Sequence, residues 1–139
     1  MHTSKPFGCW QSPFSPADMA DAIRYGSIAW SSQSGCLVWL EGRGGCGVLV
    51  AGGAGGDISD VPVEDSIRAE VGYGGGDFAV GRGAYFFAKK GQHGLFRHDI
   101  QTEQNAEITQ RSGCGAGMVL SADERWLVYI EEHSGERKL

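Results

Sequence analysis

The sequence predicts an all-β protein made of repeated sheet units. Gly26–Glu41, GSIAWSSQSGCLVWLE, has the pattern of two short strands joined by a polar turn. Gly117–Glu131, GMVLSADERWLVYIE, repeats that pattern, with Leu37 falling on Leu127 at a shift of 90 positions. Asp77–Ala88, DFAVGRGAYFFA, is a third version between the other two. Related units at intervals of about 40–50 residues are typical of β-propeller blades.

Glycine content supports the same fold class. Glycine makes up 23 of the 139 residues without a collagen-like period, as expected for many tight turns between short strands. We therefore predict a partial β-propeller with two complete four-stranded blades and part of a third. Residues 1–25 are predicted to form an extended arm and one short helix, and residues 26–139 the propeller part.

Composition excludes several classes of protein. Hydrophobic residues make up 41% of the chain and charged residues 21%, which is typical of a globular domain. The net charge of −5 argues against nucleic acid as a partner, because phosphate binding needs a clustered basic face. No run reaches the roughly 18 apolar residues of a membrane helix, and the N-terminus has no apolar core of signal-peptide length. We therefore expect no membrane partner and a cytoplasmic location. Free thiols are the expected state of Cys9, Cys36, Cys46 and Cys114.

The first segment is rich in proline and aromatic residues, and Phe7, Trp10 and Phe14 are expected to pack on other parts of the chain. A short helix should follow from Pro16, which suits the first helical position after a Ser15 cap. The four-residue spacing of Met19 and Ile23 predicts one apolar stripe, and Gly26 can end the helix.

The three predicted blades cover about residues 26–61, 77–109 and 117–139. The first should contain strands Gly26–Ser31, Cys36–Glu41, Cys46–Ala51 and Asp57–Val61. The second should contain Asp77–Val80, Ala84–Lys89, Gly94–Asp99 and Ala106–Thr109. The third should contain Gly117–Ser121 and Trp126–Glu132, with a further strand starting near Glu136. The large strand aromatics, expected to form the core between blades, are Trp30, Trp39, Phe86 and Tyr129.

Two blades and part of a third cannot close a ring, whereas propellers usually close with four to eight blades. We therefore expect the chain to be the N-terminal piece of a longer protein. A small open-sheet protein that stands alone is the alternative.

Four segments carry a resemblance to a known family. They are KPFGCWQSPFSPADMADAIRYGSIAWS, LVWLEGR, SIRAEVGYGGGDFAV and the later GLFRHD. In order and spacing the chain resembles the N-terminal propeller of prolyl oligopeptidase family serine peptidases, closest to the dipeptidyl-aminopeptidase and acylaminoacyl-peptidase branch. Gly72 stands where many members carry an acidic residue before the tyrosine of the YGGG element.

The resemblance implies a seven-bladed propeller over a C-terminal α/β-hydrolase domain with a Ser-Asp-His triad. The propeller would admit short peptides to that serine. The chain itself contains no G-x-S-x-G nucleophile elbow, so we expect no catalytic residue here. The implied function is restriction and positioning of peptide substrate for a hydrolase domain in cis. The alternative is a free-standing propeller-type interaction module without enzymatic activity.

Candidate substrate contacts lie at predicted blade rims. Glu41 and Arg43 stand at the end of the second strand of the first blade, Glu131 is the repeat equivalent of Glu41, and Tyr73 precedes three glycines. For Glu41 a structural role is favoured, with bonds to turn backbone, and substrate contact is the alternative.

The remaining motifs favour structure over ligand chemistry. Gly42–Gly47 satisfies G-x-G-x-x-G, but a β-branched run follows it instead of a helix, so a hairpin turn is predicted. Gly113–Gly117 is expected to be the lead into the third blade. His93 and His98 should point to opposite faces of one strand without metal-ligand partners. We predict no metal and no cofactor.

Overall fold

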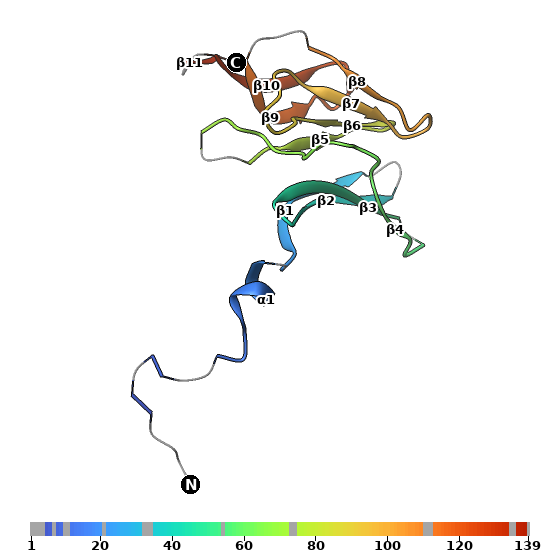
Figure 1. Cartoon of the computed structure of the whole chain (residues 1–139). Coiled ribbons are helices and arrows are strands. Elements are labelled where there is room, and N and C mark those ends of the chain that lie inside the picture. The colour runs from blue at the N-terminus through green and yellow to red at the C-terminus, as the bar shows by residue number, and fades with distance from the viewer. Residues whose placement is uncertain are drawn as a thin grey trace.

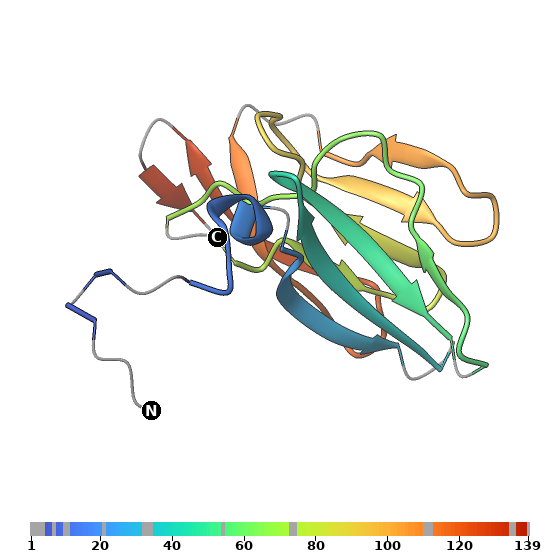
Figure 2. The same cartoon turned by 60° about the horizontal axis from the view of Figure 1, so that its bottom comes forward.

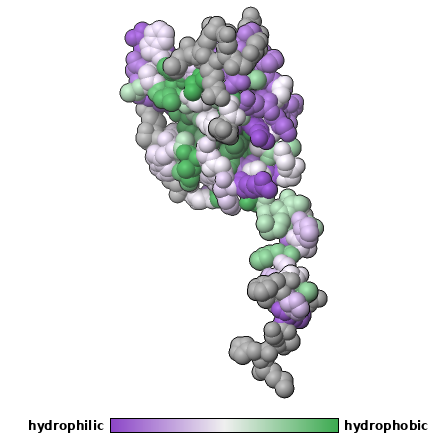
Figure 3. Space-filling view, turned by 90° about the vertical axis from the view of Figure 1, so that its left-hand side faces the viewer, coloured by the Kyte–Doolittle hydropathy of each residue, from purple (hydrophilic) through white to green (hydrophobic). Residues whose placement is uncertain are grey.

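The computed structural model describes residues 5–6, 8–9, 12–20, 22–31, 35–53, 55–72, 75–109, 113–133 and 136–138. These residues form three antiparallel sheets, preceded by a segment with one short helix that extends away from the body of the molecule (Figures 1 and 3). The all-β class predicted from the sequence is confirmed. No helix among these residues is long and apolar enough to cross a membrane.

The N-terminal helix is shorter than predicted. Helix α1 (Pro16–Ala20) starts as expected, because the Ser15 hydroxyl accepts a hydrogen bond from the Asp18 amide at 3.1 Å and the Asp18 carboxylate accepts one from the Ser15 amide at 2.7 Å. It does not extend toward Gly26, because Arg24 already pairs with Gly42 in the first sheet.

The predicted packing of this N-terminal segment is wrong where it can be judged. Met19 and Ile23 are both exposed, so the expected apolar stripe covers nothing, and Phe14 is exposed as well. Phe7 and Trp10 lie outside the described residues.

The first sheet has the strand order β1-β2-β3-β4, formed by β1 (Arg24–Ser31), β2 (Cys36–Arg43), β3 (Cys46–Gly52) and β4 (Ile58–Asp60). The four predicted strands of this unit are confirmed within a few residues at their ends.

The G-x-G-x-x-G segment is a hairpin, as predicted. Arg43 pairs with Cys46, and the two residues between them, Gly44 and Gly45, have φ angles of 55° and 85°. Two consecutive left-handed residues make the type I′ turn that joins twisted antiparallel strands, and glycine adopts it without steric strain.

The second sheet has the order β5-β6-β7-β8, with β5 (Phe78–Val80), β6 (Ala84–Phe87), β7 (Phe96–Asp99) and β8 (Asn105–Glu107). All four predicted strands exist, and each is shorter than expected. His93 precedes β7, so the prediction that it shares a strand with His98 is wrong.

The third sheet contains β9 (Cys114–Leu120), β10 (Leu127–His133) and β11 (Glu136–Lys138), with β10 in the middle. The glycine-rich run expected to lead into this unit belongs instead to β9. Its glycines allow close approach to the second sheet: Gly117 donates a backbone hydrogen bond to the Gly76 carbonyl at 3.0 Å. A Cβ on Gly76 would lie 2.5 Å from the Gly117 Cα.

The repeat extends to the pairing register. Ala29 pairs with Val38 in the first sheet and Val119 with Val128 in the third, which is the same pair after a shift of 90 positions. The same shift relates Tyr25↔Glu41 to Gly115↔Glu131 and Trp30↔Leu37 to Leu120↔Leu127. Both hairpins also contain a register irregularity between these pairs. The first and third sheets are therefore repeats in structure as well as in sequence.

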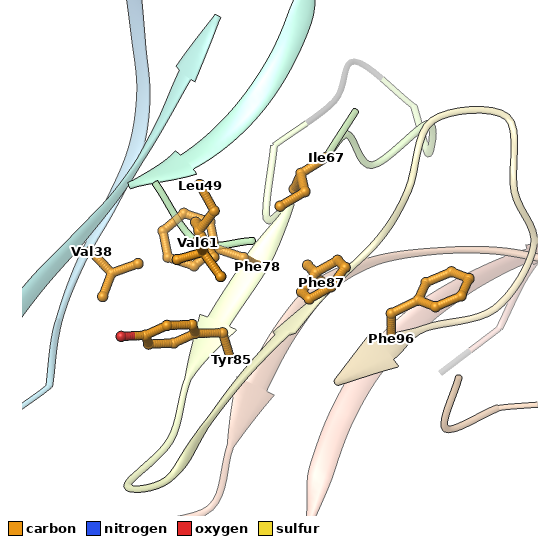
Figure 4. Close-up of a cluster of buried hydrophobic side chains, with 8 residues drawn as sticks. All are labelled: Val38, Leu49, Val61, Ile67, Phe78, Tyr85, Phe87 and Phe96. Carbon is orange, nitrogen blue, oxygen red and sulfur yellow. The ribbon is translucent and has the colours of Figure 1, made fainter. Parts of the chain in front are cut away.

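The three sheets are stacked face to face, with β5 in contact with β1 on one side and β9 on the other (Figures 1 and 2). The cluster between the first and second sheets comprises Val38, Leu49, Val61, Ile67, Phe78, Tyr85, Phe87 and Phe96 (Figure 4). The cluster between the second and third comprises Ala69, Val71, Ala79, Ala88, Leu95, Ala116 and Met118.

The prediction of the core aromatics is partly right for Phe86 and Tyr129 and wrong for Trp30 and Trp39; Trp39 is half-buried but belongs to neither core cluster. Trp30 is 61% exposed, because its side chain points away from the second sheet, whereas the neighbouring Ala29 packs against the first core cluster. Phe86 and Tyr129 are half-buried against the second core cluster. Phe87, on the opposite face of β6 from Phe86, is fully buried.

Candidate functional site

Two of the four predicted contact residues lie together on the first sheet. Trp39, Glu41 and Arg43 alternate along β2, so their side chains share one face of the sheet. The Trp39 indole N–H donates to Glu41 Oε1 at 2.6 Å, and Arg43 Nε donates to Glu41 Oε2 at 2.7 Å. Arg43 Nη1 also donates to Asp60 Oδ2 at 2.8 Å, which ties β2 to β4 across the intervening strand.

These bonds determine the charge state of Glu41. Glu41 is only 6% exposed, and the donated indole N–H, with the Arg43 guanidinium, holds the pKa of its carboxyl below the ordinary value. The bonds to Asp60 and Glu41 raise the pKa of Arg43. Both carboxylate oxygens of Glu41 thus accept a hydrogen bond from a side chain on the same strand. The arrangement acts as a structural clamp, and its bonds run between side chains rather than to turn backbone, which was the expected partner.

Glu131 occupies the equivalent place on β10 but has different neighbours. At a shift of 90 positions Tyr129 replaces the tryptophan and His133 replaces the arginine, so the side chains that flank Glu131 along the strand differ in type from those that flank Glu41. Glu41 lies in the first sheet and Glu131 in the third, with the second sheet packed between them. Tyr73 lies outside the described residues.

The two histidines predicted to be structural have different surroundings. His98 is buried, its ring is stacked on Tyr85 with centroids 5.9 Å apart, and its Nδ1 lies 3.0 Å from the Asn105 side-chain oxygen. His93 is exposed, and its Nδ1 lies 3.9 Å from the Cys114 sulfur. In the part of the chain that the structure describes, no three His, Cys, Asp or Glu side chains are grouped as metal ligands.

A pocket of about 490 Å³ that no sequence pattern predicted lies beside β1, and we call it the β1 pocket. It opens between β1, the Gly44-Gly45 hairpin and the connection from the first sheet to β5. Among the described residues, its charged lining residues are Arg24, Arg68 and Asp77. These residues are far apart in the sequence and belong to no spaced motif, so only the folded chain brings them to one cavity.

The comparisons with known proteins give no family for this chain: no family model matches it, and no curated protein matches it.

Proposed function

We propose that this chain is the non-catalytic N-terminal propeller part of a cytoplasmic serine peptidase that acts on oligopeptides. In this proposal its stacked sheets are the first blades of a propeller, which restricts and positions peptide substrate for an α/β-hydrolase domain in cis. The observation that carries the propeller assignment is the nature of the two outer sheet faces.

The outer face of the third sheet has the residues of an inter-sheet face. In the first sheet, Ala29 and Val38 face the second sheet and belong to or pack against the core cluster there. Their repeat equivalents in the third sheet are Val119 and Val128, and both are exposed. Leu40 and Ile130 are a third equivalent pair: Leu40 packs against the same cluster, whereas Ile130 is partly exposed. We call Val119, Val128 and Ile130 the front face.

The outer face of the first sheet is the repeat equivalent of the face of the third sheet that is buried against the second sheet. In the third sheet, Met118 belongs to the cluster against the second sheet, and Tyr129 packs on that cluster. At a shift of 90 positions these residues correspond to Ile28, which is exposed, and Trp39, which is half-buried. Ile28, Trp30 and Trp39 form what we call the back face. Apolar sheet faces of this kind favour covering by another sheet.

The front face therefore has the residues of a face that packs on the next sheet, and the back face has the residues of a face that packs on the preceding sheet. A unit like the second sheet would cover the front face, and a unit like the third sheet would cover the back face. The first strands β1, β5 and β9 contact one another in succession, which fits the inner-strand position around a propeller axis.

The peptidase part of the proposal rests on the resemblance of four sequence segments. The hydrolase chemistry would belong to another domain, because nucleophilic catalysis needs a serine with an adjacent base and an orienting carboxylate. No G-x-S-x-G elbow occurs in the 139 residues.

A fluorophosphonate serine probe tests this division of labour. The complete product of the coding frame should be labelled at a serine beyond Leu139, and the 139-residue chain should remain unlabelled. Labelling of the 139-residue chain would contradict the non-catalytic assignment. A coding frame that closes its propeller without a G-x-S-x-G elbow would instead favour the interaction module without enzymatic activity.

A further inference from the structure

The β1 pocket contains a nearly buried carboxylate with one oxygen unused. Asp77 is 8% exposed and lines the pocket at the start of β5. Its Oδ1 accepts a hydrogen bond from the Ala69 amide at 2.8 Å, whereas its Oδ2 has no donor among the described residues. Among the described residues, every side-chain oxygen that is sealed from solvent has a hydrogen-bond partner. Because Asp77 Oδ2 has no such partner, it must be accessible to solvent. A carboxylate that is this buried favours a cationic hydrogen-bond donor at its open oxygen.

Two guanidinium groups line the same pocket. Arg24 and Arg68 are exposed, and neither forms an ion pair with a carboxylate in the described part of the chain. Several other arginines do form such pairs: Arg43 with Glu41, Arg82 with Glu124 and Arg97 with Asp99. Guanidinium groups without an internal partner can bind a ligand carboxylate with two parallel hydrogen bonds.

The pocket is large enough for a small ligand. Its volume of about 490 Å³ lies within the range of small-molecule sites, and its apolar lining includes Leu40 and Ile67. The glycines of the β2–β3 hairpin form part of the wall and leave it open on that side. Asp77 disfavours a phosphate group in this place, because a second anion would lie next to a nearly buried carboxylate.

We propose that the β1 pocket binds the zwitterionic form of a short peptide, with the ammonium group at Asp77 Oδ2 and the carboxylate at Arg24 and Arg68. The choice of a peptide among zwitterions rests on the proposed function. The charge pattern of the pocket is independent of it, because it follows from the folded chain alone.

Ligand protection of a cysteine in the pocket gives a direct test. Cys46 is exposed and lines the pocket, whereas the exposed Cys9 does not line it and serves as an internal control. The dipeptide Ala-Leu should slow alkylation of Cys46 by iodoacetamide, measured by peptide mass spectrometry, and leave the rate at Cys9 unchanged. N-acetyl-Ala-Leu and Ala-Leu amide should each protect at least tenfold more weakly, because each has lost one charged end.

Two substitutions test the two ends of the ligand separately. Asp77→Asn keeps an oxygen acceptor for the Ala69 amide but removes the charge, and Arg68→Gln removes one guanidinium. Each should weaken protection by Ala-Leu at least tenfold, whereas Arg125→Gln, an exposed arginine outside the pocket, should not change it. Far-ultraviolet circular dichroism of all three variants checks that the sheets are intact.

Three results would overturn the assignment. These are equal alkylation of Cys46 with and without Ala-Leu, equal protection by either blocked analogue, and full protection in an intact Asp77→Asn variant. The readout needs no hydrolase domain, so it is separate from the proposed function. A coding frame without a catalytic serine would remove the peptidase proposal and leave the measured binding unchanged.

Discussion

Two valines at the same repeat position should differ sharply in their contribution to stability. Val38 and Val128 are related by the shift of 90 positions and occupy equivalent places in paired strands. Val38 is 0% exposed beneath the second sheet, whereas Val128 is 51% exposed on the front face. Substitution of each by alanine therefore compares one side chain with and without a covering sheet.

The expected magnitudes follow from burial. Alanine removes two methyl groups, and each buried carbon group contributes about 0.8 kcal/mol of transfer free energy. At Val38 the cavity left between two packed sheets adds to this loss, so Val38→Ala should lower the free energy of unfolding by about 2–3 kcal/mol. At Val128 about half of the transfer term applies and no cavity forms, so the loss should stay below about 1 kcal/mol.

Urea unfolding followed by tryptophan fluorescence measures both losses under the same conditions. Sedimentation at the same low protein concentration checks that the species is a monomer, because association would cover Val128. Equal losses for the two variants, or a larger loss at Val128, would show that the front face is covered in the isolated chain or that the repeat equivalence is wrong.

Three further predictions concern the outer faces, the clamp and the hairpin. The isolated chain should self-associate through its outer faces. Trp30→Asp should reduce the associated fraction measured by sedimentation, because a carboxylate on the back face resists burial. An unchanged distribution of associated species would argue against the back face as a contact surface. The pKa of Glu41 is lowered from its ordinary value of 4.5. The ionised carboxylate therefore contributes its full stabilisation above pH 4.5, and this stabilisation is lost as the pH falls through the lowered pKa. Glu41→Gln should therefore flatten the acid limb of stability against pH in urea unfolding, and an unaltered acid limb would contradict the clamp. Titration with NAD or ATP should give no saturable signal; micromolar binding lost in Gly44→Val would overturn the purely structural interpretation of the hairpin.

Most of the strand pattern could be predicted because its signals are local. Gly44 and Gly45 mark a two-residue turn whatever the distant chain does, and the strands before and after them follow from it. The shift of 90 positions also carried register information, because the structure pairs Ala29 with Val38 and Val119 with Val128 alike.

Features that depend on distant contacts could not be predicted. Trp30 looked like core because it is a large aromatic on a strand, but which face of β1 is covered depends on the second sheet. The predicted helix is longer than the observed one, because Arg24 pairs with Gly42 in the first sheet and so cannot continue the helix. Asp77 and Arg68 gave no signal, because the β1 pocket exists only after the connection folds back onto the first sheet.

An experimental structure of the complete product of the coding frame tests the central claim most directly. The proposal predicts that another four-stranded sheet packs on Val119, Val128 and Ile130, that the last sheet of the ring packs on Trp30, and that a hydrolase domain with a nucleophilic serine follows. A structure in which both faces remain in solvent, or are covered by something other than a sheet, would contradict it.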